Sequence, residues 1–258
     1  MNVYCDKFLN IISAFLIKYS LSGGIIMFIS TENLTKRYQT GANETIALND
    51  ARIALEQGEI GVILGPSGSG KSTLMNILGG IDRADSGTAI IDGVDITKLD
   101  DDGLTEYRRG KIGFVFQSYN LIPHLTVLEN IEIIKHISAL PLDMDDVISA
   151  VGLSDKTDRF PRELSGGEQQ RVAIARAVVK NPKLLLCDEL TGALDYESAI
   201  EALALVQGIN RRFGTTILII THNAAISAMA NRVFRLRSGK VADTRINDNV
   251  IDARGIDW

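Results

Sequence analysis

The sequence Gly-Pro-Ser-Gly-Ser-Gly-Lys-Ser at residues 65–72 constrains the fold of this chain more than any other feature. It follows an apolar run at 60–64 and opens a helical pattern at 71–78. Glycines at these spacings let successive backbone N–H groups turn toward a phosphate, and the helix N-terminus adds its positive dipole end. The chain is therefore expected to place a strand, a phosphate-binding turn and a helix in direct succession.

This motif predicts contacts with a nucleotide and with Mg²⁺. Lys71 is expected to reach the β- and γ-phosphates, and the Ser72 hydroxyl to ligate Mg²⁺. A dinucleotide-binding fingerprint would need glycine in place of Thr73, and a nucleophile elbow would need glycine in place of Ser69. A glycine-rich turn without a ligand is the remaining alternative. The predicted nucleotide-binding positions are Gly65, Pro66, Ser67, Gly68, Ser69, Gly70, Lys71, Ser72 and Thr73.

Strand and helix patterns alternate after residue 27, which predicts an α/β fold with a mostly parallel sheet. Residues 84–97 instead show the turn–strand–turn pattern of a hairpin, which predicts a small antiparallel β subdomain. Residues 104–180 are mainly helical in pattern, and the tail from 245 onward shows none. The expected strands are 60–64, 112–116, 184–187, 216–220 and 233–236, with helices at 71–78, 196–213 and 223–231.

Composition is that of an ordinary globular chain, with 45% hydrophobic and 23% charged residues. Its 27 basic and 32 acidic residues give a formal charge of −5, which argues against a general nucleic-acid coating protein. No nucleic-acid partner is expected, and a local basic patch is the alternative. Cys5 and Cys187 are too few for a disulfide framework and favour a reducing compartment. His124, His136 and His222 are scattered, so a His-rich metal site is not expected.

Residues 1–26 precede the first expected strand, which begins at Phe28. Their apolar run at 8–17 is shorter than the roughly 20 residues that a spanning helix needs, and it lacks signal-peptide flanks. We interpret 1–26 as a dispensable extension upstream of Met27. An added surface helix and a membrane-inserting segment are the alternatives.

Two carboxylates end the apolar strand at 184–187. The strand-end Asp188 is expected to hold Mg²⁺. Glu189 is expected to point to the opposite side of the strand end, where it can activate a water. A strand that simply ends at solvent in acidic residues is the alternative.

A second glycine motif, Leu-Ser-Gly-Gly-Glu-Gln-Gln at 164–170, precedes another helical pattern. Ser165 and Glu168 fit a capping box. A cap alone does not call for Gly166 and Gly167, which weaken a helix start. Their presence indicates a second anion-binding helix N-terminus.

The phosphate loop, the Leu-Ser-Gly-Gly-Glu-Gln-Gln-Arg motif at 164–171, the strand ending in Asp188-Glu189 and a later strand ending in His222 occur in one order. Over residues 28–245 the chain thereby resembles the nucleotide-binding subunit of an ABC transporter. The resemblance implies an ATPase domain at 27–245 built on a P-loop NTPase core. A helical signature subdomain is expected at about 118–175 and a C-terminal tail at 246–258.

The same resemblance implies ATP and Mg²⁺ as cofactors, and two ATP sites that form only in a head-to-tail homodimer. Ser165, Gly166, Gly167 and Glu168 of one subunit would close on the ATP of the other. The loop at 192–195 would couple the two sites across that dimer.

Individual roles also follow from the resemblance. Tyr38 would stack on adenine. Gln117 would touch Mg²⁺ and the water and sense the membrane partner, and His222 would contact the γ-phosphate. Ordinary structural roles at strand ends and edges are the alternatives for these three residues. The implied catalytic residues are Glu189, His222, Lys71 and Gln117, and the implied metal ligands are Ser72, Gln117 and Asp188.

The phrases at 75–82, 118–126 and 129–130 resemble most closely the lipoprotein-release, macrolide-export and peptide-antibiotic-resistance type of ATPase. That type serves permeases with few spans and a large extracytoplasmic domain. The chain departs from it at Leu190, where proline is usual and the lost φ restraint is expected to loosen the loop. The stretch at 132–158, in the region where a permease would dock, is also shorter than expected.

The resulting expectation is an ATP-hydrolysing subunit at the cytoplasmic face of the cell membrane. It would power a separate permease that exports or extracts a lipid-linked, peptide or drug-like substrate. Two alternatives remain: a regulatory ATP-binding module with little turnover, and a soluble ABC ATPase that does not act in transport.

Overall fold

Five parallel strands and one antiparallel edge strand form the central sheet of the computed structural model, which describes residues 27–41 and 43–257. The predicted dispensable extension at 1–26 therefore lies outside the described residues. In spatial order the strands are β11 (Lys240–Ile246), β10 (Arg232–Arg237), β4 (Ile60–Leu64), β9 (Thr216–Thr221), β8 (Leu184–Asp188) and β7 (Ile112–Val115).

The five predicted strands are all present in this sheet, so the α/β prediction is confirmed. Side chains alternate between its two faces as the pleat requires. On β9, Leu218 and Ile220 pack into one hydrophobic core, while Ile217 and Ile219 pack into the core on the other face. Burial on both faces explains the almost continuously apolar sequences of these strands, apart from the exposed Arg235 of β10.

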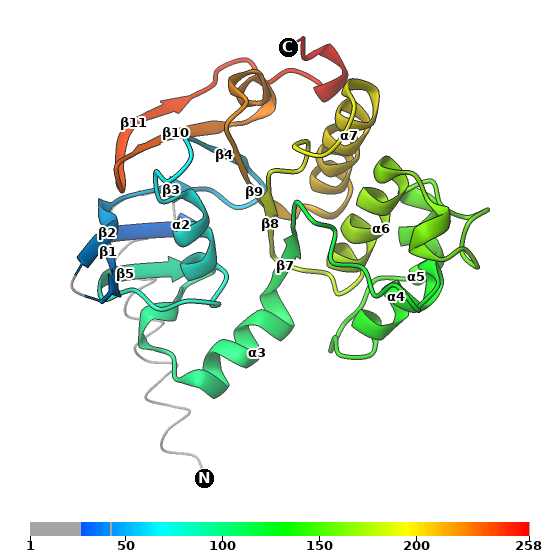
Figure 1. Cartoon of the computed structure of the whole chain (residues 1–258), viewed down its shortest axis with the longest axis horizontal. Helices are drawn as coiled ribbons and strands as arrows, with labels where there is room; N and C mark the ends of the chain where they lie inside the picture. Colours follow the sequence, from blue (N-terminus) through cyan, green and yellow to red (C-terminus); the bar gives the residue numbers. More distant parts are fainter. Residues whose placement is uncertain (1–26, 42, 258) are drawn as a thin grey trace, which may run out of the picture.

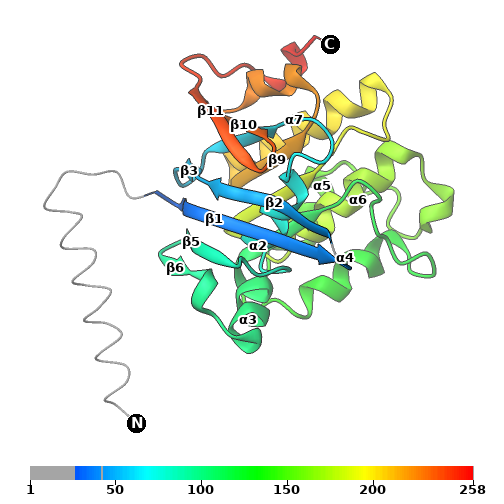
Figure 2. The same ribbon diagram turned by 60° about the vertical axis from the view of Figure 1, so that its left-hand side comes forward.

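Antiparallel strands form a second sheet, visible at the left of Figure 1 and at the front of Figure 2. Its hairpin β5–β6 confirms the turn–strand–turn prediction at 84–97. The long strand β2 was not predicted, because most of its side chains are exposed and give no apolar run. The strands are β1 (Ile29–Thr40), β2 (Asn43–Ala51), β3 (Ala54–Leu55), β5 (Ser86–Ile91) and β6 (Val94–Asp95).

Helices cover both faces of the central sheet. The predicted helices at 71–78 and 196–213 have these bounds in the structure, whereas 223–231 contains a 3₁₀ helix, η3 (Ala224–Met229). The edge strand β11, which pairs with β10, was not predicted either, because six of its seven residues are exposed. The α-helices are α2 (Lys71–Leu78), α3 (Asp101–Lys111), α4 (Val127–Lys135), α5 (Met144–Ala150), α6 (Gly166–Val178) and α7 (Tyr196–Phe213).

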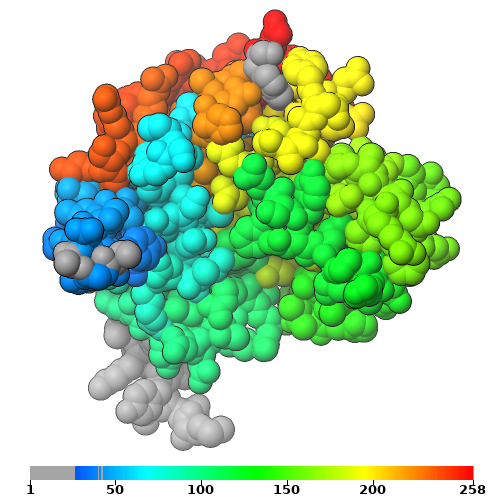
Figure 3. Space-filling view, viewed as in Figure 1, coloured from blue at the N-terminus to red at the C-terminus, as the bar shows by residue number. Residues whose placement is uncertain are grey.

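Helices α4, α5 and α6 have a hydrophobic cluster of their own, which includes Ile131, Val147 and Val172. Figure 3 shows this green part of the chain as a lobe beside the rest. This separate cluster is the physical basis for the helical subdomain proposed at about 118–175. Across residues 27–41 and 43–257, no helix combines the length and the apolarity needed to span a bilayer.

The C-terminal tail packs against α7, although its sequence showed no pattern. Ala253 and Ile256 are buried there, and Ala253 lies in a short 3₁₀ helix, η4 (Ala253–Gly255). The Gln207 side-chain amide makes two hydrogen bonds with the tail: its Nε2 donates to the Ile251 carbonyl, and its Oε1 accepts from the Ala253 N–H. The tail is therefore part of the folded unit.

Candidate nucleotide-binding site

The phosphate loop joins β4 to α2 in a conformation that only glycine allows at two points. Gly70 has φ 101°, and a Cβ there would lie 2.3 Å from the Ala47 carbonyl oxygen. A Cβ on Gly65 would lie 2.4 Å from the Leu236 carbonyl oxygen. The glycines thus let the loop pass close to two neighbouring strands while its backbone turns toward the pocket.

Helix α2 begins without a side-chain cap from the described residues, and its first turn carries no acidic residue. The first N–H groups of a helix have no intrahelical acceptor, so an uncapped start favours an external anion. Lys71 is the first residue of this helix and is largely buried. Its Nζ donates to the Gly65 carbonyl at 2.8 Å and the Pro66 carbonyl at 3.0 Å, which holds the cation over the loop.

A pocket of about 370 Å³ lies at this helix start, and residues from four separate parts of the chain line it. The phosphate loop, the strand end at 188–189, Gln117 and His222 all contribute. The lining residues are Ser67, Gly68, Gly70, Lys71, Ser72, Thr73, Gln117, Asp188, Glu189 and His222. Residues predicted from the phosphate-loop motif, from the acidic strand end and from the family resemblance, up to 155 positions apart by number, therefore meet at one place.

Asp188 and Glu189 line this pocket together. The expected alternation of side chains stops at the strand end, because Glu189 has φ 48° and leaves the extended conformation. Burial raises the pKa of Asp188; the nearby Glu189 charge also raises it, whereas Lys71 lowers it. A half-buried carboxyl that resists ionisation on its own is suited to binding beside a cation.

Glu189 is held by His222. The imidazole Nδ1 lies 3.0 Å from one carboxylate oxygen of Glu189 and 2.9 Å from the other. His222 remains 70% exposed while Glu189 is only 17% exposed. The neighbouring Leu190 is 2% exposed and packs into the core beneath α7. Its buried side chain anchors the loop that was expected to be loosened by the absence of proline.

Gln117 lies against the loop at 192–195. A Cβ on Gly192 would lie 2.8 Å from Gln117 Nε2, so the glycine makes room for the amide. The residue follows β7 by two positions and reaches the same pocket as Ser72 and Asp188.

Ser72, Gln117 and Asp188 offer a hydroxyl, an amide and a carboxylate oxygen, and oxygen donors are those that Mg²⁺ prefers. Among the described residues, there is no group of three or more His, Cys, Asp or Glu side chains that could together hold a metal ion. Such a sparse set of protein oxygens suits Mg²⁺, which retains waters and takes phosphate oxygens as further ligands.

Tyr38 lies outside this pocket, on β1, with 38% of its surface exposed. Its hydroxyl donates to Asp82 at 2.5 Å, and Lys36 Nζ lies 5.1 Å from the ring centroid. Burial and the bond to Asp82 raise the pKa of Tyr38, whereas a bond with Thr73 lowers it. The bond with Thr73 places the ring beside the phosphate loop. Lys36 and Asp82 were not predicted, although Lys36 and Tyr38 share one strand face.

The second glycine motif does not reach the pocket. Ser165 and Glu168 form the predicted capping box at the start of α6, and Glu168 also pairs with Lys156. The pKa of Glu168 is lowered to about 2, chiefly by the bond from Lys156 and next by the bond from the Ser165 backbone N–H. Gly167 has a packing reason, since its Cβ would lie 2.9 Å from Ser198 Oγ at the start of α7. Gly166 lies beside Tyr119.

The parallel sheet, the phosphate loop and the acidic strand end together define a P-loop nucleotide-binding protein. The model of the ABC transporter family matches residues 48–192, and the chain belongs to this family. The confirmed assignment agrees with the resemblance seen in the sequence motifs.

Several relatives are about equally similar. A putative ABC transporter ATP-binding protein of Mycoplasma pneumoniae, the MG065 homolog, is 40% identical over 89% of this chain and 50% of its own length. The uncharacterized ATP-binding protein MJ0796 of Methanocaldococcus jannaschii is 41% identical over 83% of this chain and 94% of its own length. The macrolide export ATP-binding/permease protein MacB of Shigella flexneri is 41% identical over 83% of this chain.

This chain spans half of the Mycoplasma relative and 34% of MacB. A solved structure of the MJ0796 cassette, dimeric and bound to ADP and Pi in a post-hydrolysis state, has a TM-score of 0.77 and 37% identity. It covers 84% of this chain and 98% of the cassette.

Proposed function

We propose that this chain hydrolyses ATP and powers a separate membrane permease. The observation that carries the proposal is the meeting of Lys71, Asp188, Glu189 and His222 at the uncapped start of α2. Lys71 and the loop N–H groups would neutralise the β- and γ-phosphates. Bound Mg²⁺ would supply further charge neutralisation there, held by Ser72, Asp188 and Gln117.

Glu189 is the proposed general base. It would accept a proton as the oxygen of water bonds to the γ-phosphorus and the bond to the bridging oxygen breaks, which leaves ADP and inorganic phosphate. His222 would orient the Glu189 carboxylate and contact the γ-phosphate. Tyr38 would stack on the adenine ring.

We propose further that two copies of the chain close head to tail around ATP. The signature residues Ser165, Gly166 and Gly167 lie at a second helix start that is separate from the pocket of their own chain. The dimeric state of the MJ0796 cassette supports this arrangement. The chain would lie at the cytoplasmic face of the membrane, bound to the permease.

The similarity to MacB, whose name describes macrolide export, supports export or extraction of a lipid-linked, peptide or drug-like substrate. A permease with few spans and a large extracytoplasmic domain is the proposed partner.

The test is to copurify the full chain with a permease from its native membrane and to measure ATP turnover of the chain alone and of the complex. We expect turnover in both and faster turnover in the complex, and Glu189→Gln should remove it from both. Turnover without a copurifying permease would favour the soluble ATPase, and ATP binding without turnover would favour the regulatory module. Either result would overturn the proposal.

A further inference from the structure

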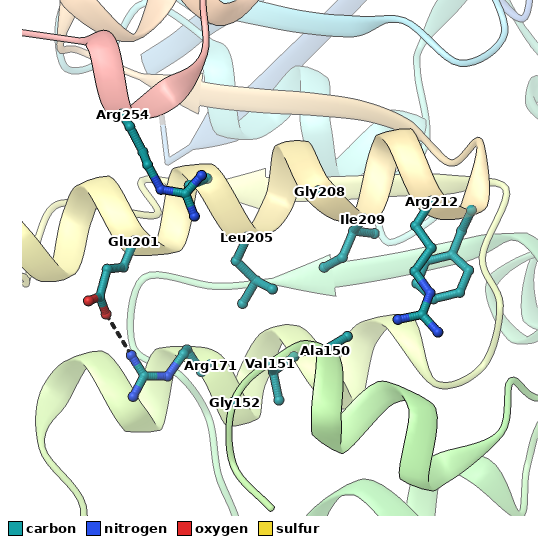
Figure 4. Close-up of a pocket in the computed structure, with 12 residues that line it drawn as sticks. Ala150, Val151, Gly152, Arg171, Glu201, Leu205, Gly208, Ile209, Arg212 and Arg254 are labelled. Atoms are coloured by element: carbon teal, nitrogen blue, oxygen red, sulfur yellow. Dashed lines mark hydrogen bonds and ion pairs between the residues drawn. The ribbon is translucent and has the colours of Figure 1, made fainter.

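A second pocket, of about 560 Å³, lies between α6 and α7 and shares no lining residue with the nucleotide pocket. The end of α5 and the C-terminal 3₁₀ helix η4 complete its wall (Figure 4). Its volume is within the roughly 300–1,000 Å³ of small-molecule sites. The proposed ATPase reaction makes no use of it.

The wall of this pocket is apolar on the side of α7. Leu205 and Ile209 point from α7 toward α6 in Figure 4, and Phe213 lines the pocket one turn further on. Gly208 also lines it, and a Cβ there would have no heavy atom within 4 Å. Glycine inside a helix costs about 1 kcal/mol relative to alanine. At Gly208 the chain therefore keeps a glycine, and with it an open space, although a larger side chain would fit there and would stabilise the helix.

Three guanidinium groups surround the apolar wall, against a single lining carboxylate among the described residues. Arg171 donates to that carboxylate, Glu201, at 2.8 Å, while its buried Nε has no partner in the described chain. Arg212 pairs at 3.3 Å with an aspartate that is not part of the wall. Arg254 is 77% exposed, and its carboxylate neighbour is 4.0 Å away.

We propose that this pocket binds an amphipathic anion, a carboxylate or phosphate carried on an apolar chain. Guanidinium groups bind such oxyanions in bidentate fashion, and each arginine retains donors beyond its present pair. The apolar chain would lie over Leu205 and Ile209, in the space beside Gly208. Charge and shape therefore select the same class of ligand.

A ligand here would also affect the nucleotide site. Helix α6 begins next to Ser165, and α7 begins next to Asp195, at the end of the loop at 192–195. A molecule that bridges the two helices would favour one of their relative positions and so change the ATP affinity of the closed dimer. This regulatory part rests on the proposed function; the binding part does not.

The binding test uses octyl phosphate with the full chain in calorimetry, with octanol and inorganic phosphate as partial ligands. We expect saturable binding of octyl phosphate and at least about tenfold weaker binding of either part. Arg212→Ala and Arg254→Ala should each weaken it about tenfold. Gly208→Leu should abolish it by filling the pocket. Gly110→Leu, at a helical glycine of α3 that is equally open, is the matched control and should bind normally.

Absence of saturable binding, or binding that Gly208→Leu leaves unchanged, would overturn the proposal. Equal affinity for inorganic phosphate would overturn the role of the apolar wall. Sedimentation with vesicles that contain phosphatidic acid separates the sources of the ligand. Sedimentation of the parent chain that Gly208→Leu abolishes would identify a membrane lipid as the ligand. Octyl phosphate binding by a chain that does not sediment with the vesicles would identify a free anion.

For the regulatory part, octyl phosphate should shift the ATP affinity of the parent chain about fivefold and leave that of Gly208→Leu unchanged. An unchanged ATP affinity in the parent would overturn the coupling. A chain that binds octyl phosphate but neither binds nor hydrolyses ATP would overturn the proposed function and leave the pocket proposal standing.

Discussion

Helices α2 and α6 both begin at a glycine motif, but their first turns are satisfied in different ways. The start of α2 has no side-chain cap among the described residues and opens into the pocket of Lys71 and Asp188. The start of α6 is capped by Ser165 and Glu168, and Glu168 is tied to Lys156. One helix start therefore calls for an external anion, and the other is stable without one.

This difference fits the roles proposed for the two motifs in one reaction. The α2 motif assembles its partners within the chain and would bind nucleotide alone. The Ser165 hydroxyl of α6 accepts the Glu168 N–H at 3.3 Å and donates its own proton to the Glu168 carboxylate, whose pKa it helps to lower. A rotation of this hydroxyl would offer the proton to an ATP held by another chain. Four predictions test this division of roles, beginning with the largest expected effect.

Lys71→Ala should abolish measurable turnover and weaken ATP binding about a hundredfold, because it removes charged hydrogen bonds to the phosphates. Nucleotide titration with a fluorescent ATP analogue measures the affinity. Lys98→Ala, an exposed lysine paired with Asp95, is the control and should bind ATP normally. Micromolar affinity retained by Lys71→Ala would remove α2 from the nucleotide site.

Glu189→Gln should lower turnover by about 10²- to 10⁴-fold and leave ATP affinity intact, since Lys71, Ser72 and Asp188 are untouched. Uncleaved ATP should then hold two chains together. Size-exclusion chromatography with Mg-ATP should show a dimer of Glu189→Gln and a monomer without nucleotide. Turnover at the parent rate would contradict the role of the general base.

Ser165→Arg in the Glu189→Gln background should return the protein to a monomer at saturating ATP, because bulk and charge at α6 obstruct the second chain. ATP affinity of the monomer should not change. Ser165→Ala is the matched control, since it removes the same cap, at about 1 kcal/mol, without added bulk. A Ser165→Arg dimer would show that α6 does not face the nucleotide of its partner.

Glu168→Gln should lower the melting temperature by about 2–4 °C at pH 7, as expected for loss of about 1 kcal/mol from the cap. The pKa of Glu168 is about 2 in the fold, below its ordinary 4.5, so its stabilising bonds are complete above pH 4.5. They are lost as the pH falls from 4.5 toward 2. The difference between variant and parent should shrink over that range. A constant difference would contradict the charged cap.

Sequence patterns and the order of the motifs predicted the central part of the fold and the residues that line the candidate nucleotide pocket. The strands at 60–64, 112–116, 184–187 and 216–220 are almost entirely apolar because both faces of the sheet are buried there, whereas the strand at 233–236 carries the exposed Arg235 among buried apolar residues. The phosphate loop was equally readable, because its glycines are required by close backbone contacts at Gly65 and Gly70. Structural features that require particular residue types, such as buried strands and close backbone contacts at glycine, can therefore be predicted from the sequence.

Tertiary structure alone decided the rest. The strands β2 and β11 and the tail around Ala253 carry few apolar residues, and their order comes from pairing and packing with distant partners. The same is true of Leu190, whose burial under α7 anchors the Glu189 loop, and of the left-handed turn at Glu189 that brings its carboxylate beside Asp188. The pocket between α6 and α7 likewise exists only because two segments 30 residues apart, at Arg171 and Glu201, meet in space. Long-range packing creates such contacts, and no local pattern encodes them.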